Sequence, residues 1–425
     1  MAPLLGCIAD DFTGATDVAS ALVSQGLRTV QVLGVSDADD APVYADAIVI
    51  ALKTRTAPVD EAVRLSLAAL RWLQRAGCGK IFFKYCSTFD STSHGNIGPV
   101  AEAMMTALAT GFTVACPAFP RNRRSIYAGY LFVGGVLLSE SSMRNHPLTP
   151  MTDANLVRVL AAQAARPVGL IDIAAVKAGV AAVKVRMQEL AAAGHGFAIA
   201  DAIDDADLEI LGDACMDLPF ATGSSGLAAG IGAALRRRGF GVGRDAAAAL
   251  PSVPGRRAVV SGSCSEATNR QVARMSERHP ALALDLGGIE ILSSVDAAMD
   301  WAAQQPVDQP ILIYSTADPA KVKAIQARFG VERSSRLIET ALAKIARRLV
   351  TDLGVRQMIT AGGETSGAIV EALGVKRLRI GGEIDPGVPW TVAEDAPKPG
   401  ALALALKSGN FGTDDFFLKA WNSLG

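Results

Sequence analysis

The chain contains 425 residues, with 41 lysines and arginines against 42 aspartates and glutamates, so its net charge is −1. This length predicts two domains, and the apolar composition suffices for a buried core in each. The balanced charge gives no electrostatic reason to expect nucleic acid or an anionic membrane as a general partner, so a small-molecule partner fits better.

The N-terminus, MAPLLGCIADD, has no basic segment followed by a long apolar core, so it predicts a buried strand and not a signal peptide. The longest apolar runs are far shorter than the roughly 20 residues of a membrane-spanning helix. Six cysteines are scattered without a CxxC pair, which is typical of reduced thiols and argues against structural zinc. We therefore expect a soluble cytoplasmic protein, and a homo-oligomer is left open.

Short apolar runs alternate with helical patterns through the first half of the chain. Such alternation is typical of βαβ units and predicts a mostly parallel sheet. The predicted strands are residues 4–9, 29–33, 47–52, 81–86, 113–116, 168–173 and 197–200. The alanine-rich stretch 174–193 predicts a helix.

Residues 236–257 read RRRGFGVGRDAAAALPSVPGRR, which lacks a sustained apolar period and is typical of an exposed interdomain linker. Strand-like runs resume at residues 258–260, 282–286, 311–314, 357–360 and 401–406. The sequence therefore predicts a first α/β domain at 1–238, a linker at 239–257 and a second α/β domain at 258–425, both with mostly parallel sheets.

The first candidate site is the segment ADDFTGATD from Ala9, where the first strand gives way to the first helix. The carboxyl ends of parallel strands line the binding crevice, so Asp10 and Asp11 are expected to face it. Adjacent carboxylates can accept hydrogen bonds from substrate hydroxyls, take a proton or hold a divalent cation. The alternative is that Asp11 or Thr13 caps the helix and Asp17 is solvated.

More polar residues follow the next strands. Lys84 stands inside an otherwise apolar strand, and a buried lysine is costly unless it meets an anion, either a ligand or a structural acid such as Asp90. Lys53 and Arg55, just past another strand, could fix a substrate carboxylate. The loop after residue 86 adds further candidates, which are Asp90, Ser91, Thr92 and His94, the last as a general acid or base or simply as a polar loop residue.

The second half carries two segments of one design, at 259–272 and 358–373, in which a strand leads through a Gly/Ser/Thr turn into a helix. Backbone N–H groups and hydroxyls at a helix start form a natural phosphate cradle. The candidate contacts are Ser261, Gly262, Ser263 and Ser265 in the first segment and Gly362, Gly363, Glu364, Thr365, Ser366 and Gly367 in the second. A third turn at 407–412, with Gly409, could cover the base or the phosphates. Neither segment is a standard P-loop or a clean GxGxxG.

At these motifs the sequence resembles the four-carbon acid sugar kinases, and most of all their 3-oxo-tetronate 4-kinase branch. The likeness spans essentially the whole chain, through IADDFTGATDVAS, FFKYCSTFDST, GNIGPV, MRNHPLTPMTD, SGSCS, AGGETSGAIV, EIDPGVPW and KSGNFG in that order. It implies an N-terminal domain that binds the sugar acid and a C-terminal domain that binds ATP with Mg²⁺. It also implies transfer of the γ-phosphate of ATP to the C4 hydroxyl of 3-oxo-tetronate.

With that resemblance, Asp10 or Asp11 is expected to accept the hydroxyl proton. Lys84, Arg55 and residues 90–92 are expected to hold the substrate, and Ser263, residues 362–365 and Gly409 to hold ATP.

Other functions remain open at this point. The chain could phosphorylate a related tetronate, threonate or erythronate. A dinucleotide-dependent oxidoreductase would share the α/β pattern, but it should show a GxGxxG turn followed by a ribose-binding acid. A sugar-acid binding protein without activity would use the aspartates only as hydrogen-bond acceptors.

Overall fold

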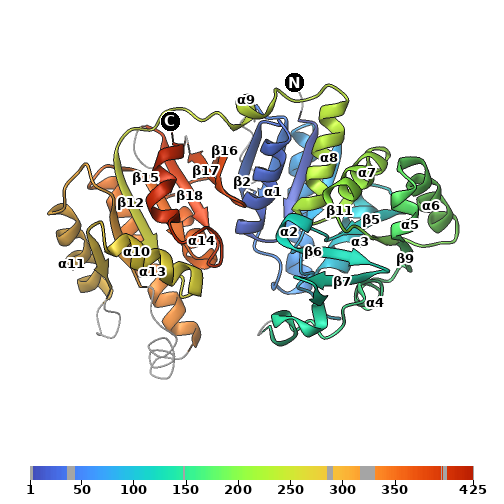
Figure 1. Cartoon of the computed structure of the whole chain (residues 1–425), viewed down its shortest axis with the longest axis horizontal. Helices are drawn as coiled ribbons and strands as arrows, with labels where there is room; N and C mark the ends of the chain where they lie inside the picture. The colour runs from blue at the N-terminus through green and yellow to red at the C-terminus, as the bar shows by residue number, and fades with distance from the viewer. Residues whose placement is uncertain are drawn as a thin grey trace. The chain divides into compact units, whose positions relative to one another are not determined.

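The structure is a computed structural model. It describes residues 3–35, 44–146, 149–284, 291–315, 331–393, 395 and 400–424, without the side chains of 291–293 and 331–335. The chain divides into two units, Met1–Ala248 and Ala249–Gly425 (Figure 1). The division falls inside the range predicted as a linker, 239–257, where Arg244–Ala248 forms the short helix α9.

The first unit is built on a sheet of parallel strands in the order β2-β3-β1-β4-β11-β5-β10-β9. Their bounds are β1 Leu5–Ala9, β2 Thr29–Leu33, β3 Ala47–Ala51, β4 Lys80–Lys84, β5 Thr113–Cys116, β9 Val168–Ile171, β10 Phe197–Ala200 and β11 Phe220–Gly223. The strands predicted in this half are confirmed, with ends shifted by one or two residues. β11 was not predicted, because its sequence FATG is short and ends in glycine.

Helices connect these strands in the α/β manner expected from the sequence. They are α1 Phe12–Ser24, α2 Val59–Arg75, α3 Ile97–Ala107, α4 Leu156–Ala161, α5 Ile173–Lys177, α6 Val180–Ala192, α7 Asp205–Ala214 and α8 Ser225–Arg237, with 3₁₀ turns at Pro120–Asn122, Leu138–Glu140, Ser142–Asn145 and Cys215–Asp217. The single helix predicted at 174–193 is wrong. Gly179 has φ +97°, outside the helical region, and it separates α5 from α6.

A small antiparallel sheet was not predicted. Its strands are β6 Arg124–Tyr127, β7 Tyr130–Val133 and β8 Val136–Leu137. The buried carboxylate of Asp201, just after β10, accepts hydrogen bonds from the backbone N–H groups of Ala128 (2.7 Å) and Gly129 (2.9 Å) in the β6–β7 turn. A side chain at the end of the main sheet therefore anchors this hairpin.

The second unit has a parallel core, β13-β14-β12-β15-β18, extended by two antiparallel strands, β17 and β16. The strand bounds are β12 Arg256–Ser261, β13 Ala281–Ala283, β14 Ile311–Tyr314, β15 Val355–Ala361, β16 Arg377–Asp385, β17 Val388–Ala393 and β18 Leu402–Lys407. The helices are α10 Glu266–Ser276, α11 Ile291–Ala303, α13 Val331–Thr351, α14 Gly363–Ala372 and α15 Phe416–Lys419, with a 3₁₀ turn at Ala420–Ser423. The predicted strand 282–286 extends past residue 284 into residues outside the described ranges, and β16 and β17 were not predicted.

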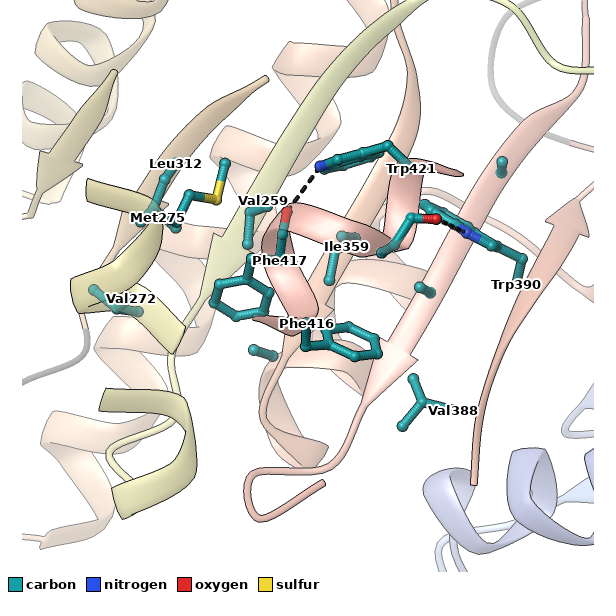
Figure 2. Close-up of a cluster of buried hydrophobic side chains, with 14 of the residues drawn as sticks. Val259, Val272, Met275, Leu312, Ile359, Val388, Trp390, Phe416, Phe417 and Trp421 are labelled. Carbon is teal, nitrogen blue, oxygen red and sulfur yellow. Dashed lines mark hydrogen bonds between the residues drawn. The ribbon is translucent and has the colours of Figure 1, made fainter. Parts of the chain in front are cut away.

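An aromatic cluster closes one part of the second unit's core (Figure 2). Phe416, Phe417 and Trp421 from the C-terminal turns pack with Trp390 of β17 and with aliphatic side chains of the sheet. The Trp390 indole donates to the Ala420 carbonyl and the Trp421 indole to the Phe417 carbonyl, both at 2.8 Å. The buried indoles therefore keep hydrogen-bond partners, and the C-terminal segment is part of the core.

Within the described ranges, no helix is both long enough and apolar enough to cross a membrane.

Candidate active site

Three neighbouring parallel strands bring the first set of predicted residues together. Ala9, the last residue of β1, is in register with Ala51 of β3 on one side and with Lys84 of β4 on the other. The residues that follow these strand ends therefore meet at one edge of the sheet, as in other open α/β sheets. Asp10, Asp11, Lys53, Arg55 and Lys84 all lie at this edge.

Asp10 is engaged by Arg55. Its side chain is 7% exposed, and its two oxygens accept hydrogen bonds from Arg55 Nε (2.9 Å) and Nη2 (2.8 Å). The Asp10 carbonyl also accepts from the backbone N–H groups of Thr54 and Arg55. Burial raises the pKa of the Asp10 carboxyl, and the guanidinium of Arg55 opposes this rise. Asp10 thus fixes the segment after β3 and turns Arg55 toward Asp11.

Asp11 is the more accessible of the two carboxylates. It is the N-cap of α1, where Oδ1 accepts from the backbone N–H of Gly14 and Oδ2 from the Thr13 hydroxyl, both at 3.1 Å. Arg55 Nη2 lies 2.8 Å from Oδ1, and the side chain is 27% exposed. Burial opposes ionisation, but the charges of Arg55 and Lys84 with these hydrogen bonds hold the pKa of Asp11 below its usual value. The capping role and a chemical role therefore coexist in one ionised side chain.

The two lysines differ sharply. Lys84 is 5% exposed, and its Nζ lies 4.0 Å from Asp11 Oδ1, its one ion pair among the described residues. The predicted structural pair with Asp90 is therefore not formed. Lys53 is exposed, with Nζ 5.1 Å from the centroid of the Phe12 ring. Arg55, which we expected with Lys53 at a substrate carboxylate, is instead held by the two aspartates.

The loop after β4 contains the predicted residues 90–92 and is tightly built. Phe89, fully buried, has φ +58°, a conformation that a bulky residue adopts only under constraint. Asp90 Oδ1 accepts from the Thr88 hydroxyl at 2.6 Å. Ser91 is buried, and its hydroxyl accepts from Gln163 Nε2 at 2.9 Å. Asp90 and Thr92 are half-buried, so they are more open to a ligand than Ser91.

Asn96 connects this loop to the segment after β3, a function that the sequence did not reveal. Its buried Nδ2 donates to the carbonyls of Thr54 (2.7 Å) and Ala57 (2.9 Å), with a longer bond to that of Arg55. A polar residue before a predicted helix is ordinarily a cap, which hid this cross-link. His94 is exposed beside Ser93, and none of its contacts reaches the aspartates.

In the second unit, the ends of β12, β15 and β18 bring the predicted phosphate cradles together. The backbone N–H of Ser263 donates to the Ala361 carbonyl at the end of β15, and that of Gly362 donates to the Lys407 carbonyl at the end of β18. A Cβ atom on Gly409 would lie 2.7 Å from Ser263 Oγ, so this turn approaches as closely as glycine allows.

The predicted nucleotide contacts differ in accessibility. Gly363 and Glu364 are exposed in the first turn of α14, where backbone N–H groups have no helical partner. Ser263 and Gly409 are half-buried. Ser261 is fully buried inside β12, and Thr365 is 4% exposed, with Gly362 buried beside it at φ +116°. The accessible groups are therefore Ser263, Gly363, Glu364 and Gly409, while the others shape the backbone around them.

Lys407 organises the third turn. This residue was expected to lie in the turn, but its structural role was not predicted. The side chain is fully buried, and Nζ donates to the Thr268 hydroxyl (3.0 Å) and to the carbonyls of Ser408 (3.0 Å), Gly409 (2.9 Å) and Phe411 (3.2 Å). Burial lowers the pKa of Lys407 to about 7. A lysine at the end of an apolar strand, as at Lys84, could have revealed this role.

The described residues contain no group of three or more His, Cys, Asp or Glu side chains that could hold a metal ion. A site with fewer carboxylates still fits Mg²⁺ that is bound together with a nucleotide. Such an ion takes one or two carboxylates and completes its shell with phosphates and water. The exposed carboxylate of Glu364, beside the N–H groups that start α14, suits this arrangement.

Comparison with protein families matches both units. A sugar-binding N-terminal domain model matches residues 5–231, and a nucleotide-binding C-terminal domain model matches residues 258–417. The fold and the two sets of strand-end residues thus define a two-domain protein with one domain of each kind.

The similarity to known proteins covers the whole chain. A 3-oxo-tetronate kinase of Burkholderia multivorans is 54% identical over 99% of this chain and 97% of its own length, and one of Cupriavidus necator is 55% identical over 100% and 98%. A solved Salmonella typhimurium structure, described as a candidate tRNA synthase, has a TM-score of 0.90 at 43% identity and covers 99% of both chains. A Haemophilus influenzae structure has a TM-score of 0.83 at 46% identity, covering 99% of this chain and 100% of its own. The chain therefore belongs to the family of the 3-oxo-tetronate kinases.

Proposed function

We propose that this protein is an ATP-dependent kinase that phosphorylates the C4 hydroxyl of 3-oxo-tetronate, giving the 4-phosphate and ADP. The chain is 54–55% identical in sequence, over nearly its full length, to proteins named 3-oxo-tetronate kinase, and this supports the choice of substrate. The observation in the structure that carries the chemistry is the ionised, partly exposed Asp11 carboxylate beside the buried ammonium of Lys84. A hydroxyl that binds there meets an acceptor for its proton.

Asp11 is the proton acceptor in this proposal. Phosphoryl transfer depends mainly on positioning and charge stabilisation, with one group that orients the nucleophile and accepts its proton. Asp11 meets the geometric requirement because part of its carboxylate faces solvent, whereas Asp10 is closed off by Arg55. Asp10 and Arg55 then hold Asp11 in place. Lys53, with Asp90 and Thr92 of the following loop, would contact the rest of the sugar acid, and Ser91 would support that loop.

The second unit would bind ATP at the meeting of its three turns. Ser263, the N–H groups of Gly363 to Thr365 and the turn at Gly409 would receive the phosphates, because helix starts and glycine turns favour anions. Ser261 and Gly362 would support these turns from below. Glu364 would help to hold Mg²⁺, which neutralises phosphate charge when it is bound. We place this enzyme in the cytoplasm.

Neighbouring functions are less well supported. Phosphorylation of threonate or erythronate would use the same groups. Only the contacts of the loop at residues 90–92 with the substrate would distinguish these acids from 3-oxo-tetronate. An oxidoreductase lacks the expected GxGxxG turn and ribose-binding acid. A tRNA-directed activity gains no support from a net charge of −1, since nucleic-acid binding usually rests on a positive surface.

The test is ADP release by a coupled assay with ATP and Mg²⁺ against 3-oxo-tetronate, threonate and erythronate. Asp11→Asn should lower kcat by about 10²–10⁴-fold, as expected for loss of a general base. Gly363→Val places a branched side chain on an exposed helix start and should raise the KM for ATP by about tenfold or more. The proposal fails if 3-oxo-tetronate does not stimulate ADP release from the wild-type protein.

A further inference from the structure

Lys84 occupies a position in which a lysine needs an anion. It ends β4, between β1 and β11, and its side chain is 5% exposed. No hydrogen bond from Nζ is formed within the described part of the chain, and its nearest carboxylate oxygen is Asp11 Oδ1 at 4.0 Å. That distance is beyond hydrogen bonding. A buried ammonium left in this state is unfavourable, so a ligand would stabilise it.

The ammonium is aimed at the start of α1. A Cβ atom on Gly14 would overlap both Lys84 Nζ and Asp11 Oδ1, so the three groups are in contact around this glycine. The N–H of Gly14 donates to the Asp11 side chain and that of Ala15 to the Asp11 carbonyl. Those of Phe12 and Thr13 donate to no other described residue. A buried cation and free N–H groups at the positive end of a 13-residue helix together form an anion site.

We infer that Lys84 and the start of α1 bind the phosphoryl group that is being transferred, and not the carboxylate of the sugar acid. This inference rests on the proposed function. If Asp11 accepts the C4 proton, the C4 oxygen lies within about 2.6–3.2 Å of Asp11. The group that forms a bond to that oxygen then lies beside the ammonium, which is 4.0 Å from Asp11.

The carboxylate of the substrate is a poor occupant of the same place. It lies at the opposite end of the four-carbon chain from the hydroxyl that reacts. Lys53, exposed just after β3, is the better partner for it.

Asp11 takes the proton of the C4 hydroxyl while the C4 oxygen forms a bond to the γ-phosphorus of ATP. The bond from that phosphorus to the β–γ bridging oxygen breaks, and ADP leaves with the electron pair. Lys84 donates a hydrogen bond to a non-bridging oxygen of the transferring group throughout, where charge stabilisation of this kind lowers the barrier.

Lys84→Met and Lys53→Met separate the two roles. With 3-oxo-tetronate, Lys84→Met should lower kcat by about 10²–10³-fold and leave the Kd, measured by calorimetry without nucleotide, within about threefold. Lys53→Met should raise that Kd, and it should lower kcat much less than Lys84→Met does. Lys84→Arg should recover part of the loss, because it restores the charge.

The inference is overturned if Lys84→Met raises the Kd about tenfold or more, or lowers kcat less than about tenfold. Melting temperatures show whether each variant is folded, and Lys84→Gln replaces Lys84→Met if the latter does not fold. A wild-type protein that binds 3-oxo-tetronate without turning it over would contradict the proposed function instead, so the two failures are distinguishable.

Discussion

Two adjacent aspartates with the same intrinsic chemistry acquire different properties from their surroundings. Asp10 is buried and bound at both oxygens by Arg55, which makes it a structural anchor. Asp11 caps α1, shares the same guanidinium and still reaches solvent. Burial pushes the pKa of Asp10 up, while the cations around Asp11 hold its pKa down. Environments that drive two pKa values apart commonly distinguish the residue that reacts from the one that supports it.

Gly14 is the residue on which this geometry depends. Its φ lies in the ordinary helical range, so alanine suits the backbone and should even favour the helix, by up to about 1 kcal/mol. The added Cβ, however, would overlap Asp11 Oδ1 and Lys84 Nζ. We therefore predict that Gly14→Ala keeps the melting temperature but lowers kcat by about tenfold or more, as small misplacements of reacting groups do.

Gly79→Ala is the matched control for this substitution. A Cβ atom there meets nothing within 4 Å, and its φ is also outside the left-handed range. It should change neither stability nor kcat. Full activity of Gly14→Ala would show that Asp11 and Lys84 need not stay in their present positions.

At the level of elements, the site consists of turns that follow parallel strands, and the turn after β18 depends on one lysine. The Lys407 ammonium donates to one hydroxyl and three carbonyls, so one of its three N–H groups is shared between two acceptors. A neutral amine would have only two N–H groups for the same four acceptors. Burial lowers the pKa of Lys407 to about 7, so the proton is present at pH 6 and is lost as the pH rises to 8.5.

We predict from this titration that the KM for ATP rises with pH across this range. Losing one hydrogen bond is worth about 1 kcal/mol, or about fivefold in affinity. Arginine stays protonated, so Lys407→Arg should remove the pH dependence. Its larger head group sets a different baseline KM, so the comparison is between the slopes of the two pH profiles. An identical pH profile for the two proteins would mean that another group titrates.

The sequence predicted the elements that carry the site better than those that surround it. Strands such as β1, β3 and β4 are apolar runs between helical patterns, and their order alone places Asp10, Arg55 and Lys84 at one edge. β16 and β17 escaped prediction because β16 mixes charged and glycine residues, as in RLRIGGEID, and pairs through an irregular register. Long-range pairing supplies their stability, and a local pattern does not contain it.

Side-chain partners were less predictable than strand order. Nothing local to Arg55 indicates that it binds both aspartates some 45 residues earlier, or that Asn96 links its carbonyl to the next loop. Lys407 was within reach, because a lysine that ends an apolar strand raises the same question as Lys84. A sequence pattern can predict that a polar side chain is buried, but it does not predict which partner forms hydrogen bonds with it.

For the whole molecule, the division into two units separates the two ligands. Each unit has its own parallel strands and its own set of turns at their carboxyl ends, and the two domain models match one unit each. A ligand that binds only the folded state stabilises its binding region by RT ln(1 + [L]/Kd), about 2.7 kcal/mol at a hundred times Kd. Amide exchange resolves such stabilisation along the chain.

We therefore predict two separate exchange footprints by mass spectrometry. A non-hydrolysable ATP analogue with Mg²⁺ should slow exchange at residues 261–268, 362–366 and 407–412. 3-Oxo-tetronate alone should slow it at residues 53–57 and 86–96, because these backbone segments carry or support its proposed contacts. Residues 10–15 do not separate the two ligands, because the start of α1 also receives the phosphoryl group of ATP in our proposal. Peptides of α6, Val180–Ala192, serve as the internal reference, because this helix overlaps none of these residue ranges. Protection of residues 53–57 and 86–96 by the nucleotide analogue alone would mean that ATP binds with the sugar-acid residues, and the assignment of one ligand to each unit would be wrong.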